Sequence, residues 1–331
     1  MQNALHITSQ LWKRDPTPWR VAASNNKNSR LDIAKRKNTG RKATRCKKKD
    51  DPAKEQSVVY VNWKSGHTAR WWHKVRTQDK QPTKEQEAFL QHVVARCEAE
   101  HAEFTEWNKP GKQKKVKLSE PARICLLGDP GAGKSHCIKL LKDFFETCVG
   151  FEHGTHFQFL ATQNSMAELI GGTTVHTWGA IPANKAAASA KHANKEVDWD
   201  QLFENCLSMR WLVIDECSTL SPGLLAMLDS FLRTKACQRH PYAYRKNTKR
   251  VDPRPFGGLN IVFAGDLWQL PPVKETALFA HPEQKADGSS YEAGEQRVLS
   301  MFWDWKRKGN KDAIQGLYCS KFRKIHATMT S

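Results

Sequence analysis

The chain has 331 residues and a formal net charge of +19, and this length can bury a sizeable core as one large or two modest domains. No apolar run approaches the roughly 18 to 20 residues that would span a membrane. The nine cysteines show no C-x-x-C pair or other metal-ligand spacing, which indicates a reducing compartment without disulfides. We therefore expect a soluble protein that has no membrane segment and binds no zinc.

The positive charge is concentrated at the N-terminus, where residues 1–80 hold 20 Lys and Arg residues against six acidic ones. A basic tail favours a polyanionic partner, and nucleic acid is the commonest. Residues 1–55 lack apolar periodicity, so we expect them to be largely disordered. The basic clusters within 35–49 fit a nuclear import signal, a loose phosphate contact or a solvated linker. The Arg-containing first thirty residues also fit a mitochondrial presequence.

A short apolar stretch, Val58–Val61, predicts a strand. The next segment, from Trp63 to Arg76, interleaves tryptophans with basic residues. Such a mixture suits the stacking and charge neutralisation of a single nucleic-acid strand. We favour the alternative, in which the tryptophans pack into a small satellite cluster. Thr83 and Gln86 then have the spacing of a capping box, which predicts the start of a helix.

The most informative motif is Gly128–Ser135, which reads Gly-Asp-Pro-Gly-Ala-Gly-Lys-Ser. The apolar run Ile124–Leu127 precedes it, and apolar residues at helical spacing over 137–148 follow it, so a strand, a loop and a helix are all predicted. Glycines let backbone N–H groups turn around a phosphate chain. Lys134 supplies a cation for the outer phosphates, and the Ser135 hydroxyl can coordinate Mg²⁺. The motif predicts a site for a nucleoside triphosphate.

A second predicted strand, Phe157–Leu160, leads toward the polar loop Gly171–Trp178. Gly171 and Gly172 end the element that precedes them, and the Thr and His side chains of the loop are donors suited to a phosphate backbone. Taken by itself, this would be an ordinary polar loop. The segment 183–195, rich in Ala and Lys, resembles a surface excursion.

The pattern of Trp211–Ile214 predicts a buried strand that ends at an acidic pair, Asp215 and Glu216. At the C-terminal end of a parallel strand, Asp215 can hold Mg²⁺ and Glu216 can orient or deprotonate an attacking water. Ser221–Pro222 then predicts the start of an apolar helix. A basic loop is expected over 233–254.

The last predicted strand, Leu259–Phe263, places Asp266 and Gln269 at its C-terminal edge. Sheets in α/β proteins bind their ligands at this edge. The alternation of apolar strands with amphipathic helices predicts an α/β fold, with a mainly parallel sheet flanked by helices.

Together these motifs resemble the PIF (petite integration frequency) family of DNA helicases, in superfamily one. The resemblance covers about residues 82–324, and its most specific part is Gly265–Pro272 following Pro255–Gly258. It implies a RecA-like P-loop ATPase domain over residues 81–331, preceded by a basic flexible tail over residues 1–80. It also implies ATP and Mg²⁺ as ligands and single-stranded or forked DNA as the partner.

The resemblance further implies a role for each matching residue. Gln86 would read the adenine, Gln269 would sense the γ-phosphate and couple it to DNA, and Arg323 would stabilise the transferring phosphoryl group. The implied catalytic residues are Lys134, Asp215, Glu216, Gln269 and Arg323, and the implied Mg²⁺ ligands are Ser135 and Asp215. The implied nucleotide contacts are Gln86, Gly128, Asp129, Pro130, Gly131, Ala132, Gly133, Lys134, Ser135 and His136. The implied DNA contacts are Gly172, Thr173, Thr174, His176 and Thr177.

The chain departs from the family pattern in two places. Gln163 and Asn164 stand where the family usually has a Thr-Gly pair, so the DNA contact of that pair is not carried over. The family's second motor domain should follow Arg323, but eight residues remain, so we expect the first motor domain only.

For the intact enzyme the resemblance implies five-prime-to-three-prime DNA unwinding in repair, recombination, replication or telomere maintenance. The expected location is the nucleus, with the mitochondrion as the alternative. Two other functions remain open at this point, a nucleotide-dependent nucleic-acid-binding module that does not unwind and a ring-forming P-loop ATPase.

Overall fold

The computed structural model describes residues 63, 66–109, 116–182, 198–238, 240–245, 252–266, 269–272, 275–278, 280 and 290–303. All of them belong to one unit, Glu55–Ser331. The predicted strand Val58–Val61, the basic clusters before it, segment 183–195 and Arg323 lie outside the described residues.

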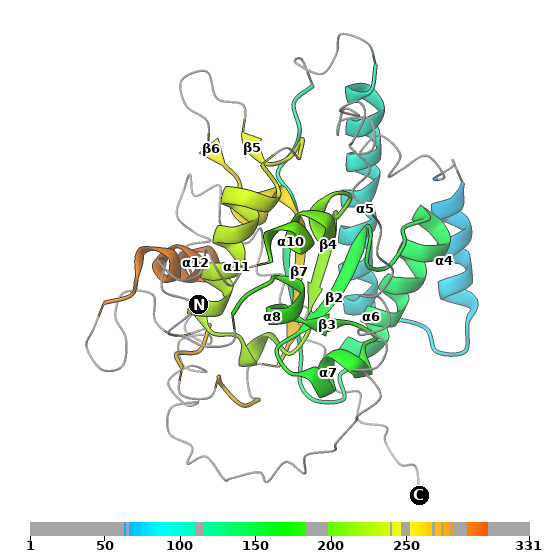
Figure 1. The fold of residues 1–331 in the computed structure, drawn as a ribbon. Coiled ribbons are helices and arrows are strands. Elements are labelled where there is room, and N and C mark those ends of the chain that lie inside the picture. The colour runs from blue at the N-terminus through cyan, green and yellow to red at the C-terminus, as the bar shows by residue number, and fades with distance from the viewer. Residues whose placement is uncertain are drawn as a thin grey trace, which may run out of the picture. The chain divides into compact units, whose positions relative to one another are not determined.

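Five parallel strands form the centre of the fold (Figure 1). Their order across the sheet is β1-β7-β4-β2-β3, so among sheet neighbours only β2 and β3 are consecutive in the sequence. This confirms the predicted α/β class with a mainly parallel sheet. The strands are β1 (Arg123–Leu127), β2 (Phe157–Ala161), β3 (Thr173–Thr174), β4 (Trp211–Ile214) and β7 (Asn260–Gly265).

Helices cover both faces of this sheet (Figure 1). One face packs against α4 (His67–Thr77), α5 (Lys84–Trp107), α6 (Lys134–Asp143) and the π-helical turn η2 (Phe144–Val149) that extends α6. The other packs against α8 (Val175–Trp178), α10 (Trp199–Cys206), α11 (Pro222–Phe231), its π-helical extension η4 (Leu232–Ala236) and α12 (Ala293–Trp303). Short α7 (Asn164–Leu169) and the 3₁₀ turns η3 (Cys217–Thr219) and η5 (Pro255–Gly258) complete the connections.

Successive residues of a strand enter two separate cores. In β1, Ile124 and Leu126 pack with the core that contains α5 and α6, whereas Cys125 and Leu127 pack with the core that contains α10 and α11. A strand covered on both faces must be apolar at every position. This is why the predicted strands read as continuous apolar runs.

The segment 67–77, which the sequence placed in a flexible tail, forms the core-packed helix α4. Trp71 and Val75 are buried. The ring of Trp71 meets that of Phe144 with centroids 4.9 Å apart, and its Nε1 donates to Asp143 at 2.9 Å. Trp71 therefore packs internally, as in the interpretation that we favoured, but it joins the main core beside the sheet instead of a small satellite cluster. The predicted tail over residues 1–80 thus includes a helix of the core.

The prediction of a plain loop over 233–254 was wrong in part. This stretch begins within η4 and contains a two-stranded antiparallel ribbon, β5 (Tyr244–Arg245) with β6 (Asp252–Pro253). Arg245 is buried and pairs with Glu120 at 2.8 Å. The stretch predicted as a basic loop thus includes an arginine that anchors the ribbon to the body of the domain.

A buried polar network lies where the strands begin. Glu100 of α5 is fully buried and accepts hydrogen bonds from Arg96 and Asn260, each at 2.7 Å. Arg210 directly precedes β4, and its Nε donates to Glu100 at 3.1 Å. Its guanidinium also donates to His240 at 2.8 Å. Since Asn260 opens β7, Glu100 ties α5 to two central strands.

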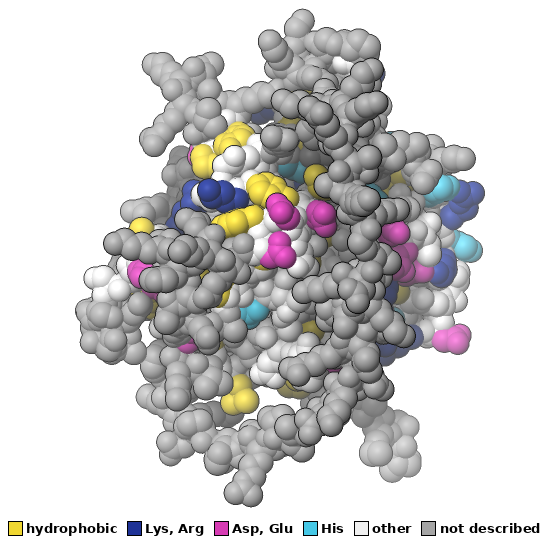
Figure 2. All heavy atoms as spheres, in the orientation of Figure 1, with side chains coloured by type: hydrophobic (Ala, Val, Ile, Leu, Met, Phe, Trp, Pro, Cys, Tyr) yellow, Lys and Arg dark blue, Asp and Glu magenta, His cyan; other side chains and the backbone are white. Residues whose placement is uncertain are grey.

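The face of the molecule in Figure 2 carries apolar and charged side chains side by side. Exposed large hydrophobic residues in the described ranges include Phe203 of α10 and its C-cap Leu207, and Met166 and Leu169 of α7. Phe203 and Leu207 are four residues apart, so they lie on one side of their helix. Within the described ranges, no helix has both the length and the apolar character needed to cross a membrane.

Candidate active site

The loop between β1 and α6 has the backbone geometry of a phosphate cradle. Gly131 and Gly133 adopt left-handed backbone with φ of 77° and 90°, which glycine tolerates without a steric penalty. The N–H of Ala132 donates to the carbonyl of Asp129 at 3.1 Å and closes the turn. Helix α6 begins at Lys134, so its N-terminal N–H groups and the positive end of its dipole lie at the loop.

Lys134 connects this loop with the acidic pair at the end of β4. Its Nζ donates to the carbonyls of Gly128 at 2.7 Å and Asp129 at 3.2 Å. The same cation acts to lower the pKa of both Asp215 and Glu216, which places the three groups within electrostatic reach of one another. Of the two residues that follow Lys134, Ser135 is exposed and His136 is half-buried.

His136, a predicted nucleotide contact, lies near the cations of Lys80 and Lys139. Burial, followed by the nearby cation of Lys80, lowers its pKa. Its Nε2 has no hydrogen-bond partner within the described ranges. The imidazole is therefore harder to protonate than a free one.

Gln86 contacts the phosphate loop from α5. The Thr83 N–H donates to its Oε1 at 3.0 Å, and the Gln86 N–H donates to the Thr83 hydroxyl at 3.3 Å, so the predicted capping box is confirmed. Its Nε2 donates to the carbonyl of Ala132 at 3.2 Å. A Cβ on Gly133 would lie 2.4 Å from this nitrogen. Gln86 thus supports the loop, and its reading of adenine stays a prediction.

The acidic pair Asp215 and Glu216 lies in a partly buried position directly after β4. Burial raises the pKa of Asp215, although its Oδ1 accepts the N–H of Glu216 at 2.9 Å. Burial also raises the pKa of Glu216, and the charges of Asp215 and Asp266 add to the effect. A carboxylate whose pKa lies nearer to neutral is a better proton acceptor for catalysis. Glu216 has a left-handed φ of 53°, a strained conformation that occurs preferentially at functional sites.

The end of β7 brings the third predicted motif to the same edge of the sheet. Asp266 is buried, and its carbonyl accepts the N–H of Gln269 at 3.1 Å. The N–H of Gly128 donates to the carbonyl of Gly265 at 3.2 Å, so this motif starts beside the phosphate loop. Gln269 is half-buried and the following Leu270 is exposed. Arg323, the remaining predicted catalytic residue, lies outside the described residues.

The predicted DNA loop is also at this edge, next to the end of β2. Thr174 caps α8, because its hydroxyl accepts the N–H of Thr177 at 3.1 Å and donates to the Thr177 hydroxyl at 2.8 Å. Thr173, Thr174 and His176 are half-buried, whereas Thr177 is exposed. Burial lowers the pKa of His176 and Glu275 opposes that change. The loop is therefore ordered by its own hydrogen bonds and remains accessible to a ligand.

Two threonines behind the acidic pair were not predicted from the sequence. The Thr219 hydroxyl donates to the carbonyl of Glu216 at 2.8 Å, and it also forms a hydrogen bond with the Thr162 hydroxyl. Thr162 follows β2 just as Asp215 follows β4. The register of these two strands pairs Leu160 with Ile214, so the residues that follow the two strands lie at the same level. Knowledge of this register would have placed Thr162 near the site.

The oxygen donors near the phosphate loop fit Mg²⁺. The Ser135 hydroxyl and the Asp215 carboxylate are hard ligands of the kind that Mg²⁺ prefers, and in nucleotide sites the ion takes one or two carboxylates together with phosphate oxygens and water. Within the described ranges, no three or more His, Cys, Asp or Glu residues are grouped to hold a metal ion.

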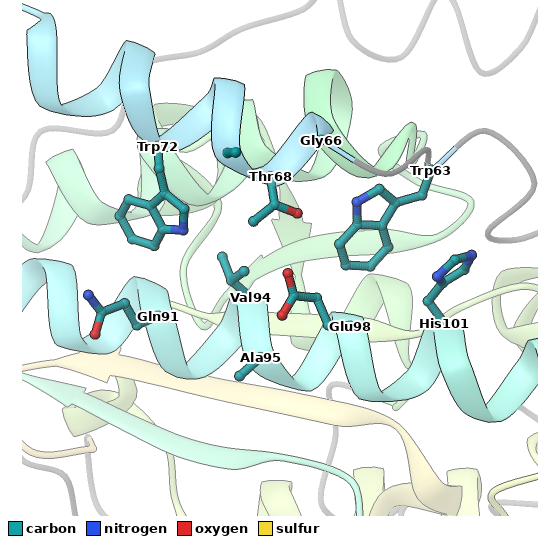
Figure 3. Close-up of a pocket in the computed structure, with 10 residues that line it drawn as sticks. Trp63, Gly66, Thr68, Trp72, Gln91, Val94, Ala95, Glu98 and His101 are labelled. Atoms are coloured by element: carbon teal, nitrogen blue, oxygen red, sulfur yellow. The ribbon is translucent and has the colours of Figure 1, made fainter.

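A separate hollow of about 710 Å³ lies between α4 and α5 (Figure 3). Trp63 and Trp72 stand toward its two ends, with Thr68 and the Glu98 carboxylate between them. A carboxylate at this position repels a phosphate backbone. The hollow therefore does not favour the stacking of a nucleic-acid strand on these tryptophans.

Comparisons with known proteins agree with the motifs. A family model described as PIF1-like helicase matches residues 113–325. The ATP-dependent DNA helicase PIF1 of Saccharomyces cerevisiae is 30% identical over 170 residues, which cover 48% of this chain and 17% of that protein. The human ATP-dependent DNA helicase PIF1 is 30% identical over 155 residues, which cover 45% of this chain and 20% of that protein.

Among solved structures, a Pif1 helicase from Bacteroides in complex with ADP-AlF3 and ssDNA is 23% identical, with a TM-score of 0.40 over 60% of this chain and 35% of that one. The chain spans about a fifth of the length of the yeast and human relatives. The family model, by contrast, matches nearly two thirds of the chain and includes the phosphate loop, the acidic pair and the third motif. The chain therefore belongs to the PIF1-like helicase family.

Proposed function

We propose that this chain binds and hydrolyses ATP with Mg²⁺, as the first motor domain of a helicase that unwinds DNA from five-prime to three-prime. The observation that carries the proposal is that Lys134, Asp215 and Glu216 lie at the carboxyl edge of the sheet, within electrostatic reach of one another. A phosphate-binding cation and a pair of carboxylates are the groups that phosphoryl transfer to water requires.

Each residue has a defined task in this proposal. Lys134 turns from the loop carbonyls to the outer phosphates of the nucleotide. Asp215 and Ser135 hold Mg²⁺, which offsets the charge of the phosphates when it is bound. Glu216 accepts a proton from the attacking water, a task that its raised pKa favours. Arg323 and Gln269 remain proposed contacts of the transferring phosphoryl group and the γ-phosphate.

The proposed partner is single-stranded or forked DNA. The loop from Gly172 to Thr177 offers hydroxyl and imidazole groups at the same edge as the nucleotide site, and the chain carries a net charge of +19. The yeast and human relatives are named ATP-dependent DNA helicases, which supports DNA as the partner. Roles in repair, recombination, replication or telomere maintenance, in the nucleus or alternatively the mitochondrion, are proposed on the resemblance and the basic clusters.

The first test is ATP hydrolysis by the Lys134→Ala variant. We expect turnover to fall by at least about 100-fold, the size of effect seen when one transition-state donor is removed. Lys139→Ala is the matched control, because Lys139 is exposed on the same helix and should leave turnover unchanged. Thermal unfolding should show both variants folded. Unchanged hydrolysis in Lys134→Ala would contradict the proposed site.

A forked DNA substrate tests the second part of the proposal. Strand separation that requires ATP and a five-prime single-stranded tail would support a helicase. Hydrolysis stimulated by single-stranded DNA without strand separation would reject unwinding by this chain and support a nucleotide-dependent binding module.

A further inference from the structure

We propose that Thr162 and Thr219 form a hydrogen-bonded relay that couples the nucleotide site to the DNA loop, with Thr162 as a positioning residue. This inference rests on the proposed function, since it assigns a link between the two sites of that function. Neither threonine belongs to the motifs from which the function was inferred.

One end of the relay holds the backbone of Glu216. The Thr219 N–H donates to the Glu216 carbonyl at 3.0 Å, and the Thr219 hydroxyl donates to the same oxygen at 2.8 Å. Two donors on one carbonyl stabilise the left-handed conformation of Glu216, which would otherwise be costly for a residue with a side chain. Thr219 therefore responds to any change in the backbone of the water-activating residue.

The other end of the relay begins the element that carries the DNA loop. Thr162 follows β2 and immediately precedes the N-cap of α7, Gln163. The Ala167 N–H donates to the Gln163 carbonyl at 3.0 Å, and the Gly172 N–H donates to the Ala167 carbonyl at 2.8 Å. A short hydrogen-bonded path thus leads from Thr162 through α7 to the first predicted DNA contact.

The direction of the central hydrogen bond can be inferred from the donors available. A threonine hydroxyl has one proton to donate, and Thr219 uses its proton on the Glu216 carbonyl. In the bond between the two hydroxyls, Thr162 must therefore be the donor and Thr219 the acceptor. All the bonds of the relay then run in one direction, from Thr162 to Thr219 to Glu216, an arrangement in which each bond polarises the next.

The relay extends a contact that the sheet already makes. The Asp215 N–H donates to the Leu160 carbonyl at 2.8 Å, which fixes the end of β4 to the end of β2. Beyond this point the segments that follow the two strands diverge. The segment after β4 leads into the turn η3, and the segment after β2 leads into α7. The hydrogen bond between the half-buried hydroxyls of Thr162 and Thr219 directly joins the side chains of these two segments. Hydrogen-bonded side chains of this kind are one means by which energetic coupling passes between two sites.

The test is the effect of nucleotide on DNA affinity in the full chain. The Kd of a fluorescently labelled oligo(dT) is measured with and without Mg²⁺ and ADP, by anisotropy, for the wild type, Thr162→Val and Thr162→Ser. We expect the wild-type Kd to change by about fivefold or more when ADP binds, the lower limit of typical allosteric coupling. Thr162→Val keeps the shape but lacks the hydroxyl, so its ratio of the two Kd values should approach one. Thr162→Ser should restore the wild-type ratio.

A structural defect in Thr162→Val would alter its affinity for ADP or for DNA alone, or its basal ATP hydrolysis, and not only the coupling between the two ligands. Thr162→Val should keep the wild-type affinity for ADP and for DNA alone, and its basal ATP hydrolysis should be unchanged. Thr219→Val should lose the coupling and also hydrolyse ATP more slowly, because it removes a hydrogen bond from Glu216. Hydrogen exchange of residues 163–172 in the wild type, with and without ADP, gives a second measurement. It does not depend on whether any variant folds.

The outcomes separate the relay from the proposed function. The relay would be overturned if Thr162→Val kept the wild-type ratio of Kd values, or if ADP did not change the hydrogen exchange of residues 163–172. The Lys134→Ala result would stand in either case. Failure of the wild type to bind ADP or DNA would overturn the proposed function and the relay together. Loss of coupling in Thr162→Val with rescue by Thr162→Ser would establish the relay.

Discussion

Gly172 lies where the backbone of β2 leaves no space for a side chain. A Cβ at this position would approach the carbonyl oxygen of Phe159 to 2.3 Å. The clash is with main-chain atoms of a central strand, which cannot move without disturbing the sheet. The neighbouring Gly171 differs in kind, because its φ is +66° but nothing lies within 4 Å of its Cβ position.

These two glycines provide a matched pair for stability measurements. We expect Gly172→Ala to lower the free energy of unfolding by about 3 kcal/mol, the upper end of the usual cost of overpacking, because the clash is with main-chain atoms. Gly171→Ala should cost about 1 kcal/mol, the usual penalty for left-handed backbone in a residue with a Cβ. Urea unfolding followed by circular dichroism measures both. Equal losses in the two variants would show that steric contact with β2 is unimportant.

The grouping of Lys134, Asp215 and Glu216 could be predicted because each follows an apolar run that is recognisable as a buried strand. Parallel strands end at the same edge, so residues placed directly after them come together whatever their distance in the sequence. The contact between Thr162 and Thr219 could not be predicted in this way. It depends on the register of β2 against β4 and on the path of a turn, neither of which apolar periodicity specifies.

At the scale of elements, α5 is held to the sheet by charge as well as by apolar packing. Its Glu100 is fully buried and accepts hydrogen bonds from Arg96, Arg210 and Asn260. Arg210 and Asn260 stand at the starts of β4 and β7. The phosphate loop receives Gln86 from the opposite part of the same helix. The position of α5 on the strands therefore affects the geometry of the nucleotide site.

Removing the charge at the centre of this network should be costly. Glu100→Ala removes the buried carboxylate that Arg210 and Arg96 share, although Arg96 keeps Glu103 at 4.0 Å. Breaking a buried pair typically costs roughly 3–5 kcal/mol. Glu98→Ala is the control, since Glu98 is exposed on the same helix and surface changes usually stay within about 0.5 kcal/mol. Chemical denaturation of both variants measures the difference. A loss in Glu100→Ala no larger than in the control would contradict the anchoring role.

The elements themselves were predicted to different degrees. The capping box of Thr83 and Gln86 and the start of α11 at Ser221–Pro222 are local patterns, and the structure confirms both. Helix α4 was missed because it buries only Trp71 and Val75. Two apolar positions in a basic segment are too few to show helical periodicity, and the packing partner Phe144 is distant in the sequence.

At the scale of the whole molecule, histidines whose pKa is lowered in the folded state make stability depend on pH. The described histidines whose pKa is lowered, in each case mainly by burial, are His92, His136, His153, His156, His176 and His240. A histidine with a lower pKa in the folded state resists protonation there. Its contribution to stability is present above the unfolded pKa of about 6.5 and is lost as the pH falls below that value.

We therefore expect the midpoint of thermal unfolding to fall as the pH is lowered from 7.5 to about 5.5, the range in which unfolded histidines gain protons. Asp215 and Glu216 act in the opposite sense, because a raised pKa favours their protonated forms in the folded state, and this gain appears at more acidic pH. His240→Gln, which keeps an acceptor for Arg210, should reduce the pH dependence. A midpoint that is constant or rises over this range would contradict the expectation.

The strand order also determines when this protein can fold during its synthesis. Strand β1 pairs with β7, and the register joins Arg123 to Ile261, 138 positions later in the chain. At roughly 5–20 residues per second, the ribosome needs about 7 to 28 seconds to complete that stretch. Throughout this interval the apolar strand before the phosphate loop lacks β7, its only neighbour in the described sheet. Nascent chains of this protein should therefore depend on chaperones until β7 has emerged, and nucleotide binding should begin only after that point.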